Sequence, residues 1–189
     1  MKIHLADGSF FVLHAEEFAR SGLARGSSLP PDMLAALLTR SEMAFARARA
    51  LSLLSRAAQT RLGLSRKLAA RGYSAPAVRH AIARMVELGY LDDRAFAEAW
   101  LRSRLEGSAH GWKAFHRTLL ARGVPRPVAE EVLGALLPAE VELERARRLA
   151  EGLSPSAAIR RLTTRGFRSR AIAAVLRELK GTGRPRGEE

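Results

Sequence analysis

The stretch Leu-Ala-Ala-Arg-Gly-Tyr at residues 68–73 decides the fold, because the chain repeats its pattern twice. It returns as Leu-Leu-Ala-Arg-Gly-Val at residues 119–124 and as Leu-Thr-Thr-Arg-Gly-Phe at residues 162–167. Each copy is typical of a helix end, where the arginine meets the negative end of the helix dipole and the glycine takes a positive φ. Three copies predict an internal repeat, in which these three glycines are structural residues: Gly72, Gly123 and Gly166.

An amphipathic pattern follows each copy, so each glycine is expected to separate two helices. After the first copy, Val78, Ile82 and Met85 recur at spacings of three and four residues, which places them on one helix face. The same spacing recurs after the other two copies. Each repeat is therefore predicted to contain about three short helices, too few to bury its apolar faces well alone, so adjacent repeats should stack.

The starts of these helices carry their own signals. Thr39-x-x-Glu42 has the form of a capping box and predicts the first helix of repeat 1. Gly89 is expected to end the third helix of that repeat, and Asp92 or Asp93 to cap the first helix of repeat 2. In repeat 3, Ser154-Pro155 predicts another helix start.

A different pattern precedes the repeats. Apolar runs at residues 3–5 and 10–13 flank Asp7-Gly8, which predicts a two-stranded hairpin. A short helix is expected near residues 15–21, and Pro30-Pro31 should open the next helix.

Together these patterns predict an all-α protein of tandem three-helix repeats, which form an elongated, curved solenoid with a short N-terminal β-hairpin extension. The predicted divisions are an N-terminal extension (1–40), three repeats (41–91, 92–138 and 139–180) and a disordered tail (181–189).

Charge is the strongest compositional feature of the chain. The net charge is +13, of which residues 61–189 carry +11. Such a field attracts polyanions, first nucleic acid and then acidic protein surfaces. The chain has no cysteine, no apolar run long enough to span a membrane and no signal-peptide pattern. We therefore expect a cytoplasmic protein, monomeric, with no membrane association.

The sequence offers little for catalysis. Its five histidines are scattered, no metal-ligand spacing or phosphate-binding glycine loop is present, and the paired carboxylates Asp92 and Asp93 are better explained as helix caps. We expect no enzyme activity, no metal and no cofactor.

Basic clusters beside the second and third helices are the better candidates for function. An arginine in the repeated phrase can equally be a dipole partner, and a charge cluster can be only a solvated face. The residues predicted to bind DNA or a protein filament are Arg66, Lys67, Arg71, Arg102, Arg104, Arg117, Arg122, Arg160, Arg161, Arg165, Arg168 and Arg170. Trp100, Trp112 and Phe115 could stack on bases, but their positions on apolar helix faces favour core packing.

The segment Gly-Tyr-Leu-Asp-Asp at residues 89–93, with Phe96-Ala97, Arg102-Ser103-Arg104 and the phrase at residues 119–124, resembles the RecX family of bacterial modulators of the RecA recombinase. The connector at residues 105–111 departs from the short basic turn usual in that family. The resemblance implies a negative regulator, which binds in the groove of a RecA filament on single-stranded DNA and inhibits filament extension, ATP hydrolysis, strand exchange and repressor cleavage. Its partners would be RecA, single-stranded DNA and double-stranded DNA.

Two other classes stay open. A three-helix unit can place a recognition helix in the major groove, which would make this a sequence-specific helix-turn-helix-like DNA-binding protein. The third helices are mostly Ala, Val and Leu, which does not favour base reading. A scaffold that binds an acidic protein without nucleic acid is the other class.

Overall fold

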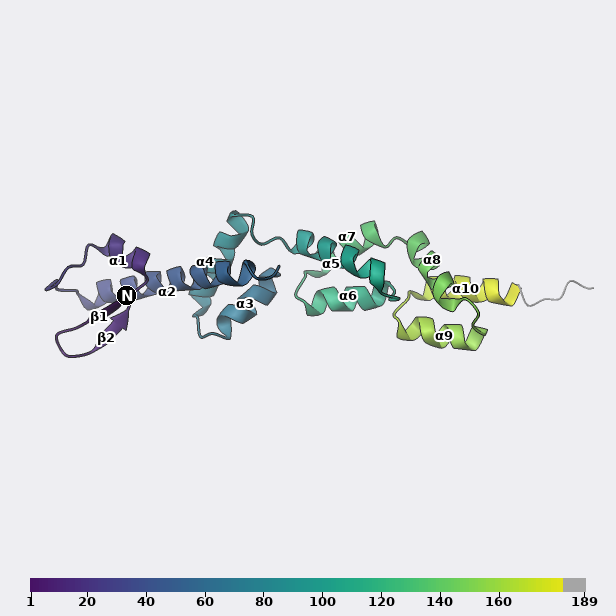
Figure 1. The fold of residues 1–189 in the computed structure, drawn as a ribbon, viewed down its shortest axis with the longest axis horizontal. Coiled ribbons are helices and arrows are strands. Elements are labelled where there is room, and N and C mark those ends of the chain that lie inside the picture. Colours follow the sequence, from purple (N-terminus) through teal and green to yellow (C-terminus); the bar gives the residue numbers. More distant parts are fainter. Residues whose placement is uncertain (182–189) are drawn as a thin grey trace, which may run out of the picture. The chain divides into compact units, whose positions relative to one another are not determined.

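The computed structural model describes residues 1–181 of the chain and contains, within them, ten helices and one two-stranded sheet (Figure 1). The chain divides into two compact units, residues 1–92 and the part from Asp93 on. The prediction of a mainly α-helical chain of three-helix repeats with an N-terminal hairpin is confirmed. The predicted disordered tail lies outside the described residues, except for Gly181.

The hairpin pairs β1 (Lys2–His4) with β2 (Phe10–Val12) in antiparallel register, with Ile3 opposite Phe11. The turn follows from Asp7, whose carboxylate accepts hydrogen bonds from the Ser9 N–H and hydroxyl, and from Gly8 at a φ of 85°. The hairpin is followed by α1 (Ala15–Ser21) and α2 (Pro31–Leu54). The fully buried Leu13 precedes α1, and the His14 N–H donates to Ser41 of α2 at 2.7 Å.

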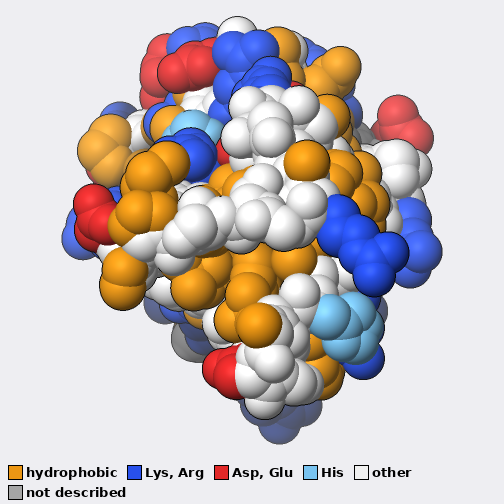
Figure 2. All heavy atoms as spheres, turned by 90° about the vertical axis from the view of Figure 1, so that its left-hand side faces the viewer, with side chains coloured by type: hydrophobic (Ala, Val, Ile, Leu, Met, Phe, Trp, Pro, Cys, Tyr) orange, Lys and Arg blue, Asp and Glu red, His pale blue; other side chains and the backbone are white. Residues whose placement is uncertain are grey.

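Apolar side chains stay exposed on this extension. Phe10 and Val12 of β2 are 54% and 50% exposed, and the Lys2 ammonium lies 3.7 Å from the centroid of the Phe10 ring. Figure 2 views the end of the molecule that carries the hairpin, where hydrophobic side chains gather among Lys and Arg.

The predicted helix start at Thr39 is wrong. Helix α2 runs without a break through Thr39, whose hydroxyl donates to the Ala35 carbonyl at 2.9 Å, one turn earlier. No glycine or proline interrupts residues 32–54. Because this run consists mostly of helix-forming residues, the capping-box pattern inside it does not end one helix and start another. Glu42 instead caps another helix: its carboxylate accepts from the Ser74 N–H at 2.7 Å and from the Ser74 hydroxyl at 2.6 Å.

Each repeat surrounds its own apolar core. In repeat 1 the end of α2 packs with α3 (Arg61–Ala69) and α4 (Ala75–Glu87). Repeat 2 contains α5 (Asp93–Gly107), α6 (Trp112–Ala121) and α7 (Arg126–Leu136). Repeat 3 contains α8 (Ala139–Ala150), α9 (Pro155–Thr164) and α10 (Ser169–Gly181).

The repeated phrase ends the second helix of each repeat, as predicted. Gly72, Gly123 and Gly166 have φ values of 85°, 89° and 75°, and Gly89 has 72° after α4. In repeat 2 the Val124 N–H donates to the Leu119 carbonyl at 3.0 Å, which folds the apolar residue back onto its helix. The glycines are thus placed where a side chain would be strained.

Replacing Gly72 with alanine should lower the free energy of unfolding by about 1 kcal/mol, because a Cβ there meets nothing within 4 Å and only the positive φ is unfavourable. Urea unfolding followed by circular dichroism measures this. Gly72→Asn should cost less, since asparagine tolerates the left-handed region. Equal stability of parent and Gly72→Ala would contradict the backbone explanation.

Repeats 2 and 3 cap each other's helices. The first N–H groups of α6 have no side-chain cap from their own N-cap residue, and repeat 3 supplies their acceptors: Gly111 N–H donates to Arg165 O and Lys113 N–H to Gly166 O, both at 2.9 Å. Between them, Trp112 N–H donates to the Glu142 carboxylate, also at 2.9 Å. The carbonyls at the end of α9 therefore meet the donors at the start of α6, which matches the two helix dipoles.

A second set of bonds crosses the same boundary. Arg145 of α8 donates to the Leu105 carbonyl at 2.8 Å and to the Ser108 carbonyl, near the end of α5. Burial and the neighbouring Arg148 lower the pKa of Arg145. We call both sets of hydrogen bonds between repeats 2 and 3 the repeat 2–3 junction. Together they hold in place residues 108–111, the part of the connector that joins α5 to α6.

Candidate nucleic-acid interface

Repeat 1 presents its predicted cations on α3. Arg66 and Lys67 are exposed on the last turns of the helix, and the Lys67 ammonium donates to Gln59 at 2.7 Å. The Arg71 guanidinium donates to the Lys67 carbonyl at 2.9 Å, so it acts as the predicted partner of the helix end. Within residues 1–181, none of the three forms an ion pair.

In repeat 2 the predicted cations differ in their surroundings. Arg102 pairs with Glu98 at 2.9 Å, which partly offsets its charge. Arg104 and Arg117 are exposed and, in the described part of the chain, have no carboxylate within ion-pair distance. The Arg122 guanidinium lies over the Trp100 ring, 5.3 Å from its centroid.

Four of the five predicted cations of repeat 3 are exposed. Arg160, Arg161 and Arg165 on and after α9, together with Arg170 on α10, are exposed and form no ion pair among residues 1–181. Arg168 differs, because its Nε donates to the buried carboxylate of Glu142 and its side chain is only 34% exposed. Arg168 therefore also belongs to the repeat 2–3 junction.

The predicted structural acids lie at the start of repeat 2. Helix α5 begins at Asp93, which is buried, with Asp92 directly before it and Gly89 at the preceding turn. The described residues hold no group of three or more His, Asp or Glu side chains placed to bind a metal ion. None of their helices is long and apolar enough to cross a bilayer.

The three aromatic residues pack in repeat 2. Phe115 is buried, and Trp100 meets it edge to face with ring centroids 6.0 Å apart. Trp112 stacks on His116 with centroids 4.7 Å apart. Core packing thus accounts for much of their surface, and Trp100 also forms part of a cavity wall.

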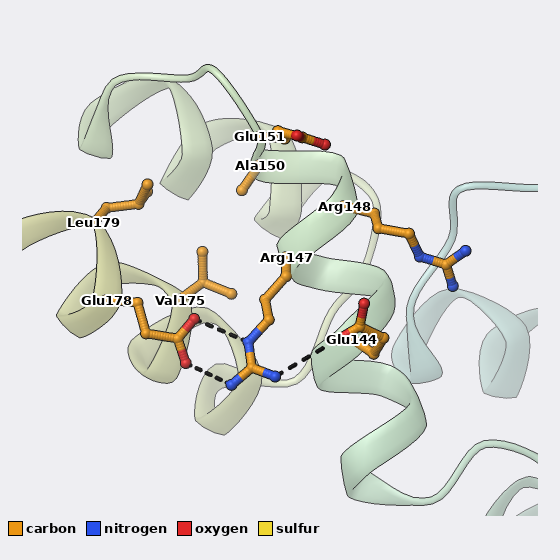
Figure 3. Close-up of a pocket in the computed structure, with 8 residues that line it drawn as sticks. All are labelled: Glu144, Arg147, Arg148, Ala150, Glu151, Val175, Glu178 and Leu179. Carbon is orange, nitrogen blue, oxygen red and sulfur yellow. Dashed lines mark hydrogen bonds and ion pairs between the residues drawn. The ribbon is translucent and has the colours of Figure 1, made fainter. Parts of the chain in front are cut away.

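A cavity of about 360 Å³ between α8 and α10 does not suit an anion (Figure 3). Arg147 points across it to Glu178, with two hydrogen bonds of 2.9 and 2.7 Å, and also contacts Glu144. These hydrogen bonds raise the pKa of Arg147 and lower the pKa of Glu178. The charge of Arg147 in this cavity is therefore offset by Glu178 and Glu144.

The cavity between α5 and α6, which we call the repeat-2 cleft, has the opposite character. Its volume is about 280 Å³ and its wall contains two guanidinium groups and no carboxylate. Burial, and then the charges of Arg165 and Arg145, lower the pKa of His110 in this wall. The residues that line the cleft are Trp100, Arg104, Ser108, His110, Ala114, Phe115, Thr118 and Arg122.

Sequence reasoning missed the residues that organise these surfaces. Glu42 and Glu142 each cap the third helix of their repeat, through Ser74 and Arg168, but neither stands out among the acids of a helical stretch. A signal exists only when the repeats are aligned, since Ser74 and Arg168 both lie two residues after the repeated glycine. In repeat 2 the corresponding residue is Pro125, which has no N–H to cap.

The fold and charges define a protein of tandem three-helix repeats with exposed arginines on its second helices. Two family models match it: the RecX second three-helix domain over residues 92–133 and the RecX first three-helix domain over residues 46–85. A regulatory protein RecX of Thermus thermophilus is 41% identical over 122 residues, which cover 62% of this chain and 80% of that protein. The chain belongs to the RecX family.

A second relative matches the same family, and two solved structures share the fold. A regulatory protein RecX of a Mycobacterium species (strain JLS) is 42% identical over 104 residues, covering 55% of this chain and 56% of the relative, so the match spans about half of that protein. The crystal structure of a regulatory protein RecX aligns with a TM-score of 0.72 at 22% identity, over 92% of both chains. RecX from Lactobacillus salivarius aligns with a TM-score of 0.68 at 23% identity, over 74% of this chain and 97% of the other.

Proposed function

We propose that this protein binds along a RecA filament on single-stranded DNA and inhibits it, without chemistry of its own. Membership of a family whose curated relatives are named regulatory protein RecX supports a regulatory role. The inhibited processes are filament extension, ATP hydrolysis, strand exchange and repressor cleavage. The protein acts in the cytoplasm as a monomer.

The observation that carries the proposal is the set of exposed arginines on α9 and after it. Arg160, Arg161 and Arg165 are not neutralised by a carboxylate within residues 1–181, although the chain contains 19 acids. A cation without a partner in its own protein attracts phosphate or an acidic surface at a smaller cost than a cation that must first leave an ion pair. The filament offers both kinds of target.

Reversing Arg160 and Arg161 to glutamate should weaken inhibition of DNA-dependent ATP hydrolysis by RecA at least about tenfold, because two repelling charges replace two attracting ones. ATP hydrolysis on single-stranded DNA, titrated with the protein at two salt concentrations, measures this. Removing one phosphate contact should lower the slope of log affinity against log salt by roughly 0.7.

A matched control separates position from total charge. Arg25 and Arg56 are exposed and lie outside the predicted set, and reversing both changes the net charge by the same amount. The control should inhibit nearly as well as the parent. Equal inhibition by the Arg160/Arg161 variant would remove that pair from the interface, and a parent protein that leaves RecA unaffected at stoichiometric amounts would overturn the function.

The helix-turn-helix alternative has a distinct result. A sequence-specific DNA-binding protein at nanomolar concentration would protect one duplex sequence from nuclease cleavage, at a salt concentration where other duplex sequences remain unprotected. The proposed function predicts protection that does not depend on sequence.

A further inference from the structure

We propose that the repeat-2 cleft binds one phosphate group of a single-stranded nucleic acid, held by Arg104 and Arg122. This deepens the proposed function and rests on it, because the DNA strand of the filament is taken as the source of the phosphate. The cleft is a particular subsite, made by side chains of α5, the connector and α6.

The charge of the wall selects an anion. Arg104 and Arg122 supply two guanidinium groups, and none of the residues that line the cleft is acidic. Two other cavities of the same unit differ in this respect: Glu144, Glu151 and Glu178 line the one in Figure 3, and Glu140 and Glu142 line another. Arginines also line both of those cavities, so an anion that enters either of them meets mixed charge, whereas an anion in the repeat-2 cleft meets cations and dipoles without a carboxylate.

Two lining residues also lack acceptors. The Ser108 hydroxyl and the Trp100 indole N–H are buried and have no hydrogen-bond partner among the described residues. A buried donor without an acceptor is unfavourable, and a phosphate brings several acceptor oxygens. Ser108 lies on the connector just after α5, where rotation of its side chain can turn the hydroxyl toward a ligand.

The aromatic wall favours a nucleotide over a protein carboxylate. Trp100 and His110 are partly exposed and each lies edge to face with the buried Phe115, with ring centroids 6.0 and 6.1 Å away, so theirs are the rings that a base can reach. The Arg122 guanidinium covers the Trp100 ring. Bases of single strands stack on aromatic rings and on guanidinium planes next to the phosphates that they accompany, whereas an aspartate or glutamate brings no such partner.

The repeat 2–3 junction holds this cleft in shape. The connector that carries Ser108 and His110 is fixed at Ser108 by the bond from Arg145 and at Gly111 by the bond to Arg165. A site whose wall is already fixed loses less conformational entropy when it binds. The longer connector of this chain, which departs from the family pattern, therefore forms part of the cleft wall.

Fluorescence tests the proposal on the whole 189-residue chain, which has two tryptophans. In the Trp112→Phe protein Trp100 is the only tryptophan, and titration with oligothymidylate should quench it. Arg104→Ala and Arg122→Ala should each weaken oligothymidylate binding roughly tenfold, the typical effect of losing one charged hydrogen bond. Arg126→Ala, in the same repeat but outside the cleft, should change the affinity less than about twofold.

A second readout is the titration of His110 by NMR. Burial, Arg165 and Arg145 lower its pKa, and Arg104 and Arg122 line the same cleft, so a bound phosphate should raise that pKa toward its ordinary value. The Arg104→Ala/Arg122→Ala double variant should show no such increase on adding oligothymidylate.

The outcomes distinguish the subsite from the function. If oligothymidylate binds but leaves Trp100 and His110 unchanged, and both arginine variants bind like the parent, the subsite is wrong while DNA binding stands. If poly-glutamate quenches Trp100 and oligothymidylate does not, the cleft takes a protein carboxylate and the phosphate assignment is overturned. If the parent neither binds oligothymidylate at low salt nor inhibits RecA, the proposed function itself fails.

Discussion

Replacing Gly111 with alanine should destabilise the unit that begins at Asp93 by about 3 kcal/mol, the upper part of the range for an overpacked core. A Cβ on Gly111 would lie 2.4 Å from the Phe167 Cα and 2.6 Å from its backbone nitrogen. Both atoms belong to the main chain, which cannot swing aside as a flexible side chain can. The φ of Gly111 is −96°, so alanine brings no backbone strain and the whole effect reports the close contact.

Chemical unfolding monitored by circular dichroism measures this effect, and hydrogen exchange of the Gly111 and Lys113 amides locates it. Those amides donate to Arg165 and Gly166, so loosening of the repeat 2–3 junction should accelerate their exchange. Gly134 in α7 is the matched control: a Cβ there meets nothing within 4 Å, so Gly134→Ala should stabilise the chain by about 1 kcal/mol. Unchanged stability of Gly111→Ala would mean that the two repeats separate easily.

The glycines of the repeated phrase show which structural properties can be predicted from the sequence and which cannot. Its helix-end pattern correctly predicts a positive φ at Gly72 and Gly166, because that property is local. The pattern gives no hint that a Cβ at Gly166 would lie 2.7 Å from the Ala114 nitrogen, whereas one at Gly72 meets nothing. That difference arises from a neighbouring repeat, and hydrophobic periodicity does not contain it. Gly166→Ala should therefore cost more than Gly72→Ala.

The acidic residues show the same limit of prediction from the sequence. Thr39 and Glu42 match a local capping pattern, yet Glu42 caps a helix that starts 32 residues later, at Ser74. A capping pattern specifies which groups can bond, and tertiary packing decides which donors reach the carboxylate. The basic candidates divide in the same way: exposure of Arg160 follows from its place on an amphipathic helix, while the pairing of Arg168 with Glu142 requires the folded repeat.

Replacing Glu142 with alanine should destabilise the same unit by about 3 kcal/mol. Glu142 is only 1% exposed and accepts three hydrogen bonds: from Trp112 N–H at 2.9 Å, from Arg168 N–H at 3.0 Å and from the Arg168 guanidinium. Its removal leaves two backbone donors without an acceptor and one cation without its partner. We place the cost at the lower end of the range for a broken buried pair, because Arg168 is one-third exposed and water recovers part of its hydration.

Two further variants sharpen the Glu142 measurement. Glu140 is exposed on the same helix, so Glu140→Ala should change the free energy of unfolding by less than about 0.5 kcal/mol. A double-mutant cycle with Arg168→Ala should give a coupling energy of about 2 kcal/mol between Glu142 and Arg168. A coupling near zero would show that Glu142 acts only through the backbone donors of Trp112 and Arg168; the junction would then depend on helix capping, and the Arg168 guanidinium would be available to a phosphate after all.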